Sequence, residues 1–88
     1  MAQKIEFTNE NFRILAHLYD NKNEEHLVKT TQQEVSDALG ISRVTINKVF
    51  SKLKDSGYIT QDTTKVGRYY LTDSGLTVVE TFRNINRK

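Results

Sequence analysis

Apolar residues recur at helical spacing near the start of the chain. Four of them follow the i, i+3, i+4, i+7 pattern of a single helix face, namely Phe12, Leu15, Ala16 and Tyr19. The pattern predicts a first helix over about residues 9–20, with these side chains turned toward the core. The polar segment NKNEE follows and has turn-like composition, so the helix is expected to end before it.

Two short helices are predicted in the middle of the chain. Thr31 and Glu34 have the spacing of a capping box, which starts the first of them. Gly40 ends it, because glycine adopts the left-handed conformation without strain from a Cβ atom. Ser42 is a suitable N-cap for the second helix, which is predicted to run over residues 42–56. Since so few residues separate the two helices, they must cross sharply, as in a helix-turn-helix.

The hydrophobic pattern changes after this second helix. The runs YITQ and RYYLT favour strands, and the segment DTTKVG between them has turn chemistry, so a β-hairpin is predicted over about residues 58–72. The earlier run HLVKT is a candidate for one more strand, at a sheet edge. A last helix is predicted over about residues 73–86. The expected fold class is therefore α+β, and residues 1–88 are expected to form a single domain.

The helix predicted over residues 42–56 has two different faces. Its apolar face suits packing against the core and consists of Ile46, Val49, Phe50 and Leu53. The opposite face carries Arg43, Asn47 and Lys48 in register. Arginine can donate two hydrogen bonds to guanine and asparagine can pair with adenine, whereas lysines suit the phosphate backbone. The outer face is therefore a candidate for contact with duplex DNA.

Charge is distributed unevenly along the chain. The formal net charge is only +2, but residues 1–40 hold four Lys/Arg against seven Asp/Glu, and residues 41–88 hold nine against four. The positive potential thus coincides with the candidate DNA-binding helix. The chain has no cysteine, which excludes disulfides and thiolate metal sites, and no apolar run long enough for a signal or membrane segment. A cytoplasmic protein without cofactor is expected.

The segment Gln32–Ser51, QQEVSDALGISRVTINKVFS, resembles the twenty-residue helix-turn-helix of bacterial DNA-binding proteins. SRVTINKVFSKLKDSGYI is similar to the recognition helix and following strand of Crp-type and MarR-type regulators, and YYLTDSG is similar to the strand and helix that follow the wing in MarR-like proteins. The resemblance implies a winged helix-turn-helix fold with a three-helix core, a two- to three-stranded β-wing and a C-terminal helix. It also implies that helix 42–56 reads the major groove.

The predicted DNA-binding residues come from three segments. A helix N-terminus at residues 31–33 can bind a phosphate, helix 42–56 supplies base readers and phosphate contacts, and the hairpin adds two cations. The full set is Thr31, Gln32, Gln33, Ser42, Arg43, Val44, Thr45, Asn47, Lys48, Ser51, Lys52, Lys65 and Arg68. The wing loop departs from the MarR pattern, which has an Asp and Arg pair in a longer basic loop, so we expect phosphate contact rather than minor-groove insertion.

The last helix carries an apolar stripe with a spacing of three residues: Leu76, Val79, Phe82 and Ile85. The stripe can pack on the chain's own first helix or on a second copy. Dimers that read palindromic half-sites are common among such proteins, so a homodimer through this helix is the favoured expectation. The intramolecular alternative stays open, because a domain this small needs its apolar contacts.

The main functional prediction is a transcriptional regulator, specifically a repressor that excludes polymerase. A replication initiator or partition factor of a plasmid or phage is an alternative, and a winged helix that binds proteins is another. An enzyme is not expected, because nothing around His17 and His26 has the spacing of a nucleophile, base and orienting group. A metal sensor built on these histidines and nearby glutamates, as in some ArsR-like proteins, is disfavoured because the spacing fits no known site.

Overall fold

A computed structural model describes residues 9–65 and 67–85 of the chain. Four helices and three strands follow one another in the order α1 (Asn9–Asp20), β1 (Leu27–Lys29), α2 (Gln32–Leu39), α3 (Arg43–Asp55), β2 (Ile59–Gln61), β3 (Arg68–Leu71) and α4 (Asp73–Ile85). This order confirms the α+β class and each predicted element. Residue 86, the predicted end of the last helix, lies outside the described residues.

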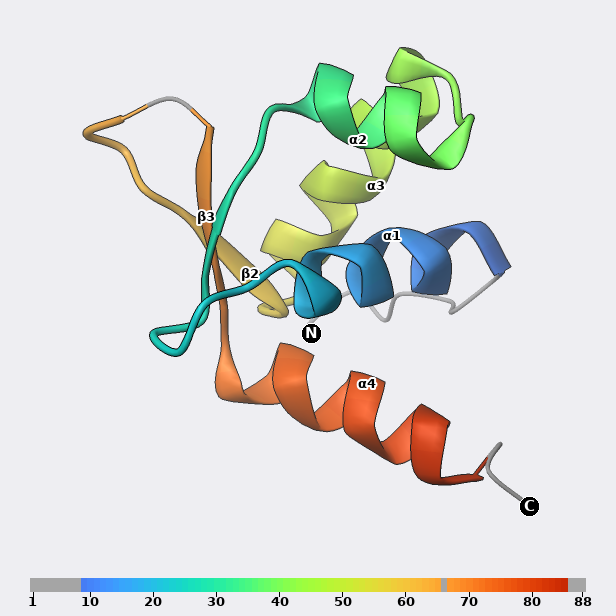
Figure 1. Cartoon of the computed structure of the whole chain (residues 1–88), viewed down its shortest axis with the longest axis vertical. Helices are drawn as coiled ribbons and strands as arrows, with labels where there is room; N and C mark the ends of the chain where they lie inside the picture. Colours follow the sequence, from blue (N-terminus) through green and yellow to red (C-terminus); the bar gives the residue numbers. More distant parts are fainter. Residues whose placement is uncertain (1–8, 66, 86–88) are drawn as a thin grey trace.

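The three strands form one antiparallel sheet in the order β1-β3-β2. Strand β3 is central, pairing Tyr70 with Leu27 of β1 on one side and with Thr60 of β2 on the other. The strand predicted from the run HLVKT is therefore confirmed, and β1 lies at an edge of the sheet. Figure 1 shows the hairpin of β2 and β3 extending from the helices, with its loop at the same end of the molecule as α2.

The predicted caps set the bounds of α2 and α3. The Thr31 hydroxyl accepts from the Glu34 N–H at 3.1 Å, while the Glu34 carboxylate accepts from the Thr31 N–H at 2.8 Å. Gly40 ends α2 in the left-handed conformation, with φ of 66°. The Ser42 hydroxyl then accepts from the Thr45 N–H at 3.3 Å and starts α3. Both ends of α2 and the start of α3 are therefore set by local chemistry.

The inner face of α1 is broader than its amphipathic pattern predicts. Ile14 and Leu18, which were not predicted to face the core, are fully buried together with Leu15. Phe12 and Tyr19, which were predicted there, are only partly buried. The physical reason is that α1 packs against α2 and α3 on one side and α4 on the other (Figure 1), so two faces of the helix are covered.

The start of α4 is fixed by a close approach to the end of α3. The Thr72 N–H donates to the Tyr58 carbonyl at 3.1 Å, and the Thr72 hydroxyl donates to the Gly57 carbonyl at 2.6 Å. The same hydroxyl accepts from the Gly75 N–H at 3.1 Å, so Thr72 is the N-cap. A Cβ atom on Gly75 would overlap the Tyr58 carbonyl oxygen.

No helix among the described residues is long and apolar enough to cross a bilayer.

Candidate nucleic-acid interface

Helix α3 is held in place by its apolar face. Ile46, Phe50 and Leu53 are fully buried, and Val49 is nearly so. The Phe50 ring meets the Tyr69 ring of β3 edge-on, with centroids 4.9 Å apart. Because both the helices and the sheet contact this face, the outer face of α3 has a fixed orientation relative to the rest of the molecule.

The outer face of α3 carries the predicted base readers together. Arg43, Val44, Asn47 and Lys48 line a shallow, open hollow of about 320 Å³. Val44 is 66% exposed although it is apolar, and it lies on the first turn beside Arg43. An apolar side chain between polar ones is suited to the methyl group of thymine. The hollow thus combines hydrogen-bonding and apolar groups on a helix that fits the major groove.

Four side chains of α2 and α3 that were predicted as separate DNA contacts form hydrogen bonds with one another. The side-chain oxygen of Gln32, Oε1, accepts from Arg43 Nε at 3.4 Å and from Asn47 Nδ2 at 3.2 Å. The side-chain oxygen of Gln33, Oε1, accepts from Arg43 Nη1 at 3.4 Å. All of these partners are neutral amides, so the charge of Arg43 is not compensated by them. The contacts between α2 and α3 were not predicted, because only the crossing of the two helices brings these residues together.

The lysines on the exposed side of α3 point into solvent. Lys48 and Lys52 are exposed and form no ion pair with any residue the structure describes. Ser51 is exposed one turn beyond Asn47 on the same side. Two uncompensated cations spaced one turn apart along a helix suit the phosphates beside a groove. The predicted placement of the polar face on the outside of α3 agrees with the structure.

Other predicted contact residues have structural partners at the helix starts. Ser42 is exposed and its hydroxyl also meets that of Thr45 at 3.0 Å, so the pair belongs to the cap of α3. The Thr31 hydroxyl belongs to the cap of α2. Backbone N–H groups in the first turn of α2, at Gln32 and Gln33, lack acceptors within the helix, as at every helix start. They and the helix dipole can bind an anion.

The wing loop is closed by Asp62. Its carboxylate accepts from the N–H and hydroxyl of Thr64, at 2.9 and 2.6 Å, and these bonds lower the pKa of Asp62, aided by the charges of Arg68 and Lys65. Lys65 is exposed in the loop and Arg68 is half-buried at the start of β3. Of these two cations, Lys65 is therefore the exposed one near the tip of the wing. Figure 1 places this loop at the end of the molecule opposite α4.

The residues of α4 that were predicted as a dimer interface differ in how far they are buried within the chain itself. Val79 is fully buried in the chain's own core, and Leu76 is partly buried against it, so the Val79 side chain is not available to a second copy. Phe82 packs on Phe12 of α1, with ring centroids 5.3 Å apart. Only Ile85 is largely exposed, at 64%. Val79 was predicted at a dimer interface but is buried, because α4 covers the second buried face of α1.

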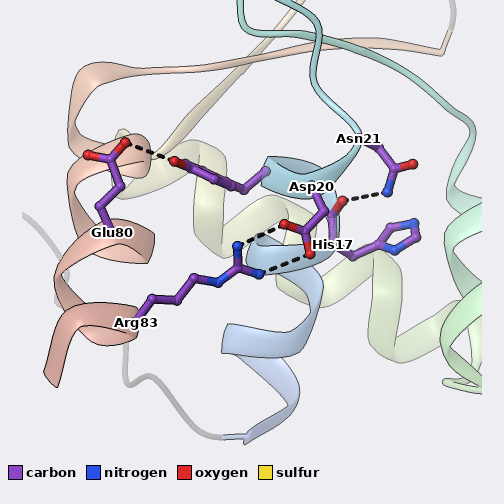
Figure 2. Close-up of polar contacts among 6 residues, drawn as sticks. His17, Asp20, Asn21, Glu80 and Arg83 are labelled. Atoms are coloured by element: carbon purple, nitrogen blue, oxygen red, sulfur yellow. Dashed lines mark hydrogen bonds and ion pairs between the residues drawn. The ribbon is translucent and has the colours of Figure 1, made fainter. Parts of the chain in front are cut away.

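A polar cluster joins α1 to α4 and was not predicted from the sequence. Arg83 donates to both carboxylate oxygens of Asp20, at 2.8 and 2.9 Å (Figure 2). These hydrogen bonds lower the pKa of Asp20 and raise that of Arg83. The Tyr19 hydroxyl donates to the Glu80 carboxylate at 2.8 Å, which raises the pKa of Tyr19. No local pattern signals these pairs, because the partners lie more than sixty residues apart in the sequence.

The two histidines lie away from the outer face of α3. His17 is on α1, where its carbonyl accepts from the Asn21 side chain at 2.7 Å (Figure 2). His26 precedes β1 in the left-handed conformation, with φ of 68°. Within residues 9–65 and 67–85, no group of three or more His, Cys, Asp or Glu side chains is arranged to hold a metal ion.

Comparisons with known proteins give matches in sequence and in structure. The family model of the Crp-like helix-turn-helix domain matches residues 12–74. The S. aureus MepR–DNA complex superposes with a TM-score of 0.69 at 28% identity, over 89% of this chain and 63% of that one. An S. aureus MepR mutant bound to an oligodeoxyribonucleotide gives 0.71 at 28% identity, over 89% and 56%.

A further MepR mutant, from a multidrug-resistant S. aureus clinical isolate, gives a TM-score of 0.73 at 27% identity, over 89% of this chain and 56% of that one. The chain therefore spans between 56% and 63% of these three MepR chains. No curated protein sequence is significantly similar to it. Together the matches confirm the winged helix-turn-helix fold and the resemblance to Crp-type and MarR-like proteins.

Proposed function

The chain belongs to the Crp-like helix-turn-helix family, and we propose that it is a sequence-specific DNA-binding protein that regulates transcription. The observation that carries this proposal is the outer face of α3, where Arg43, Asn47 and Lys48 are exposed side by side on a helix whose opposite face is buried in the core. The proposal is also supported by two similar structures of MepR, which contain DNA or an oligodeoxyribonucleotide. No catalytic role is proposed.

In the proposed complex, α3 lies in the major groove and three residues read bases. Arg43 donates to guanine O6 and N7 through its free Nη hydrogens, Asn47 pairs with adenine, and Val44 contacts a thymine methyl. These residues lie on the first two turns of α3, which is the part of a recognition helix that contacts base edges. Ser42, Thr45 and Ser51 border the same face and supply hydroxyl contacts at its edges.

The phosphate backbone is proposed to bind on both sides of α3. Lys48 and Lys52 contact one strand, and the first turn of α2, with Thr31, Gln32 and Gln33, binds a phosphate through backbone N–H groups. Lys65 and Arg68 of the wing reach a phosphate farther along the duplex. These contacts fix register without reading sequence, and they make binding depend on salt.

The proposed active form is a homodimer that acts as a repressor in the cytoplasm. A single α3 reads few base pairs, and a two-fold dimer doubles the site. The exposed end of α4 supports this proposal, since Ile85 is 64% exposed beside the half-buried Phe82. Bound at a promoter, such a dimer excludes polymerase by occupying the duplex. Ile85→Glu is expected to yield monomers because it changes the exposed residue and leaves the packing of Phe82 on Phe12 intact. An unchanged sedimentation mass would contradict a dimer interface at this end of α4.

Selection of bound sites from random duplex DNA tests the proposed function. The expected result is an enriched inverted repeat, with half-sites about 10 base pairs apart as for other helix-turn-helix dimers. Enriched direct repeats would favour a replication or partition role instead. Binding to a protein partner that survives Ala substitution of Arg43, Lys48 and Lys52 would favour the interaction module. Absence of any enriched site, with binding insensitive to salt, would rule out the DNA-binding function.

A further inference from the structure

One amide of α2 contacts two of the proposed base readers on α3. The side-chain oxygen of Gln32, Oε1, accepts from Asn47 Nδ2 at 3.2 Å and from Arg43 Nε at 3.4 Å. Gln32 is the first residue of α2, while Arg43 and Asn47 lie one turn apart on α3. An amide oxygen has two lone pairs, so a single side chain can hold both residues at once.

The chemistry of these partners fixes which way each amide faces. Arginine has only donors, so the Gln32 atom turned toward Arg43 must be the oxygen. The Asn47 atom that faces this oxygen must then be a donor, which is Nδ2. The carbonyl oxygen of Asn47 is therefore turned away from α2. An amide is otherwise free to rotate by half a turn at little cost, since its oxygen and nitrogen have similar size.

This orientation decides what Asn47 presents to a base. With one N–H bonded to Gln32, the groove meets the Asn47 oxygen and the remaining N–H. That pair matches adenine, which offers the N6 amino group as donor and N7 as acceptor. The opposite orientation would place the Asn47 oxygen against the Gln32 oxygen with no hydrogen between them and would leave both N–H groups free to donate, as the acceptors O6 and N7 of guanine require. Through the orientation of the Asn47 amide, Gln32 would favour adenine over guanine without contacting either base.

We propose that Gln32 is a positioning residue that sets the base preference of Asn47 by holding its amide in the adenine-binding orientation. The inference rests on the proposed function, because it requires α3 to read bases in the major groove. It gives Gln32 a role beyond a phosphate contact at the start of α2. Its side-chain N–H groups remain available for that contact, because only its oxygen is used here.

Two substitutions of Gln32 separate positioning from phosphate binding. Gln32→Met removes both the acceptor and the donors with little change in size. Gln32→Glu keeps an oxygen acceptor for Arg43 and Asn47 but removes the donors and adds a negative charge. Affinities are measured for a preferred duplex and for one with A·T replaced by G·C at the position where Asn47→Ala abolishes the preference.

Gln32→Met is expected to reduce the preference for adenine over guanine roughly three- to ten-fold, the effect of losing one hydrogen bond. Gln32→Glu is expected to weaken binding to both duplexes alike and to keep the preference. In an Asn47→Ala background, Gln32→Met should change the preference no further. Gln33→Met is the matched control, because Gln33 contacts Arg43 but not Asn47, and it should leave the preference at this position unchanged.

Two results would overturn the positioning role. One is a Gln32→Met variant that keeps the full preference for adenine, and the other is an equal loss of preference in the Met and Glu variants. Failure of the proposed function looks different, since the wild-type chain would then show no preferred duplex and Arg43→Ala would have no effect. Thermal unfolding of each variant shows whether it is folded, and both Gln32 variants are expected to fold because this side chain is outside the core.

Discussion

Arg43 and Arg83 lie at opposite ends of the molecule and differ in whether a carboxylate compensates their charge. At the end formed by α2, the start of α3 and the wing, the hydrogen-bond partners of Arg43 among the described residues are the neutral amides of Gln32 and Gln33, which do not compensate its charge. At the end formed by α1 and α4, Arg83 makes two short hydrogen bonds to the Asp20 carboxylate. The charge of Arg43 therefore remains available to an anionic partner, whereas the charge of Arg83 is compensated by Asp20.

This difference shows why a count of charges does not locate a binding surface. Arg83 contributes to the positive balance of residues 41–88, yet its charge is cancelled by Asp20, which belongs to the negative half. Lys48 and Lys52 contribute to the same balance and form no ion pair within the described residues. The electrostatic surface is thus set by which charges remain unpaired after folding.

The largest expected effect concerns the start of α4, outside the DNA-binding end, where Gly75 meets the segment that follows α3. Gly75→Ala should destabilise the chain by about 3 kcal/mol, because the new Cβ would overlap the Tyr58 carbonyl oxygen and force backbone to move. Helix propensity alone predicts the opposite sign, a gain of about 1 kcal/mol. Urea unfolding measures the change, and Ser74→Ala, at the exposed neighbouring position, is the control. A more stable Gly75→Ala variant would contradict the close packing described here.

The two arginines themselves provide the next test. Arg43→Ala should weaken binding to a selected duplex by about 1–3 kcal/mol and relax the preference at one base position. Arg83→Ala, which removes the same charge from the other end, should leave binding nearly unchanged. Equilibrium binding to specific and random duplexes measures both. Equal losses for the two variants would mean that net charge, and not position, controls binding.

A smaller and more uniform effect is expected for the lysines of α3. Lys52→Ala should weaken binding to all sequences alike and reduce the slope of log K against log salt by about one, as expected for one lost phosphate contact. Lys22→Ala is the matched control, because Lys22 lies over the Tyr19 ring at the far end of α1. A change of base preference in Lys52→Ala would show that this side chain reads sequence.

The smallest expected effect concerns the Asp20–Arg83 pair. Both side chains are about half exposed, so Asp20→Asn should cost only about 0.5 kcal/mol at neutral pH. The pKa of Asp20 is lowered in the folded chain, so this contribution is present above the ordinary aspartate pKa and is lost as pH falls through the lowered value. Unfolding measured between pH 6 and pH 2 should show the wild type and the variant converging at the acid end. A constant difference would contradict the role of this pair.

The local chemistry of the sequence predicted most of the fold. The Thr31–Glu34 pair and Gly40 fix the two ends of α2, Ser42 fixes the start of α3, and each acts through its immediate neighbours. The exposed side of α3 was predicted for the same reason, because apolar spacing along one helix defines both its faces. The assignment of residues 1–88 to a single domain stays a prediction, as do the individual DNA contacts.

The remaining features depend on how distant elements pack. Ile14 and Leu18 are buried because α4 covers a second face of α1, which the spacing within α1 does not reveal. Val79 is buried for the same reason. The contacts of Gln32 with Arg43 and Asn47 also require the crossing of two helices, so the sequence identified these residues as candidates but not as partners.

Titration of a selected duplex into isotope-labelled protein, followed through backbone amide resonances, tests the central claim most directly. The account predicts that the shifts concentrate in the first turns of α2 and α3 and in the wing loop, while the Asp20–Arg83 region of α1 and α4 stays unchanged. The shifts should diminish as salt is raised. Shifts centred on α4, or none on α3, would contradict the assignment of the DNA-binding surface to the outer face of α3.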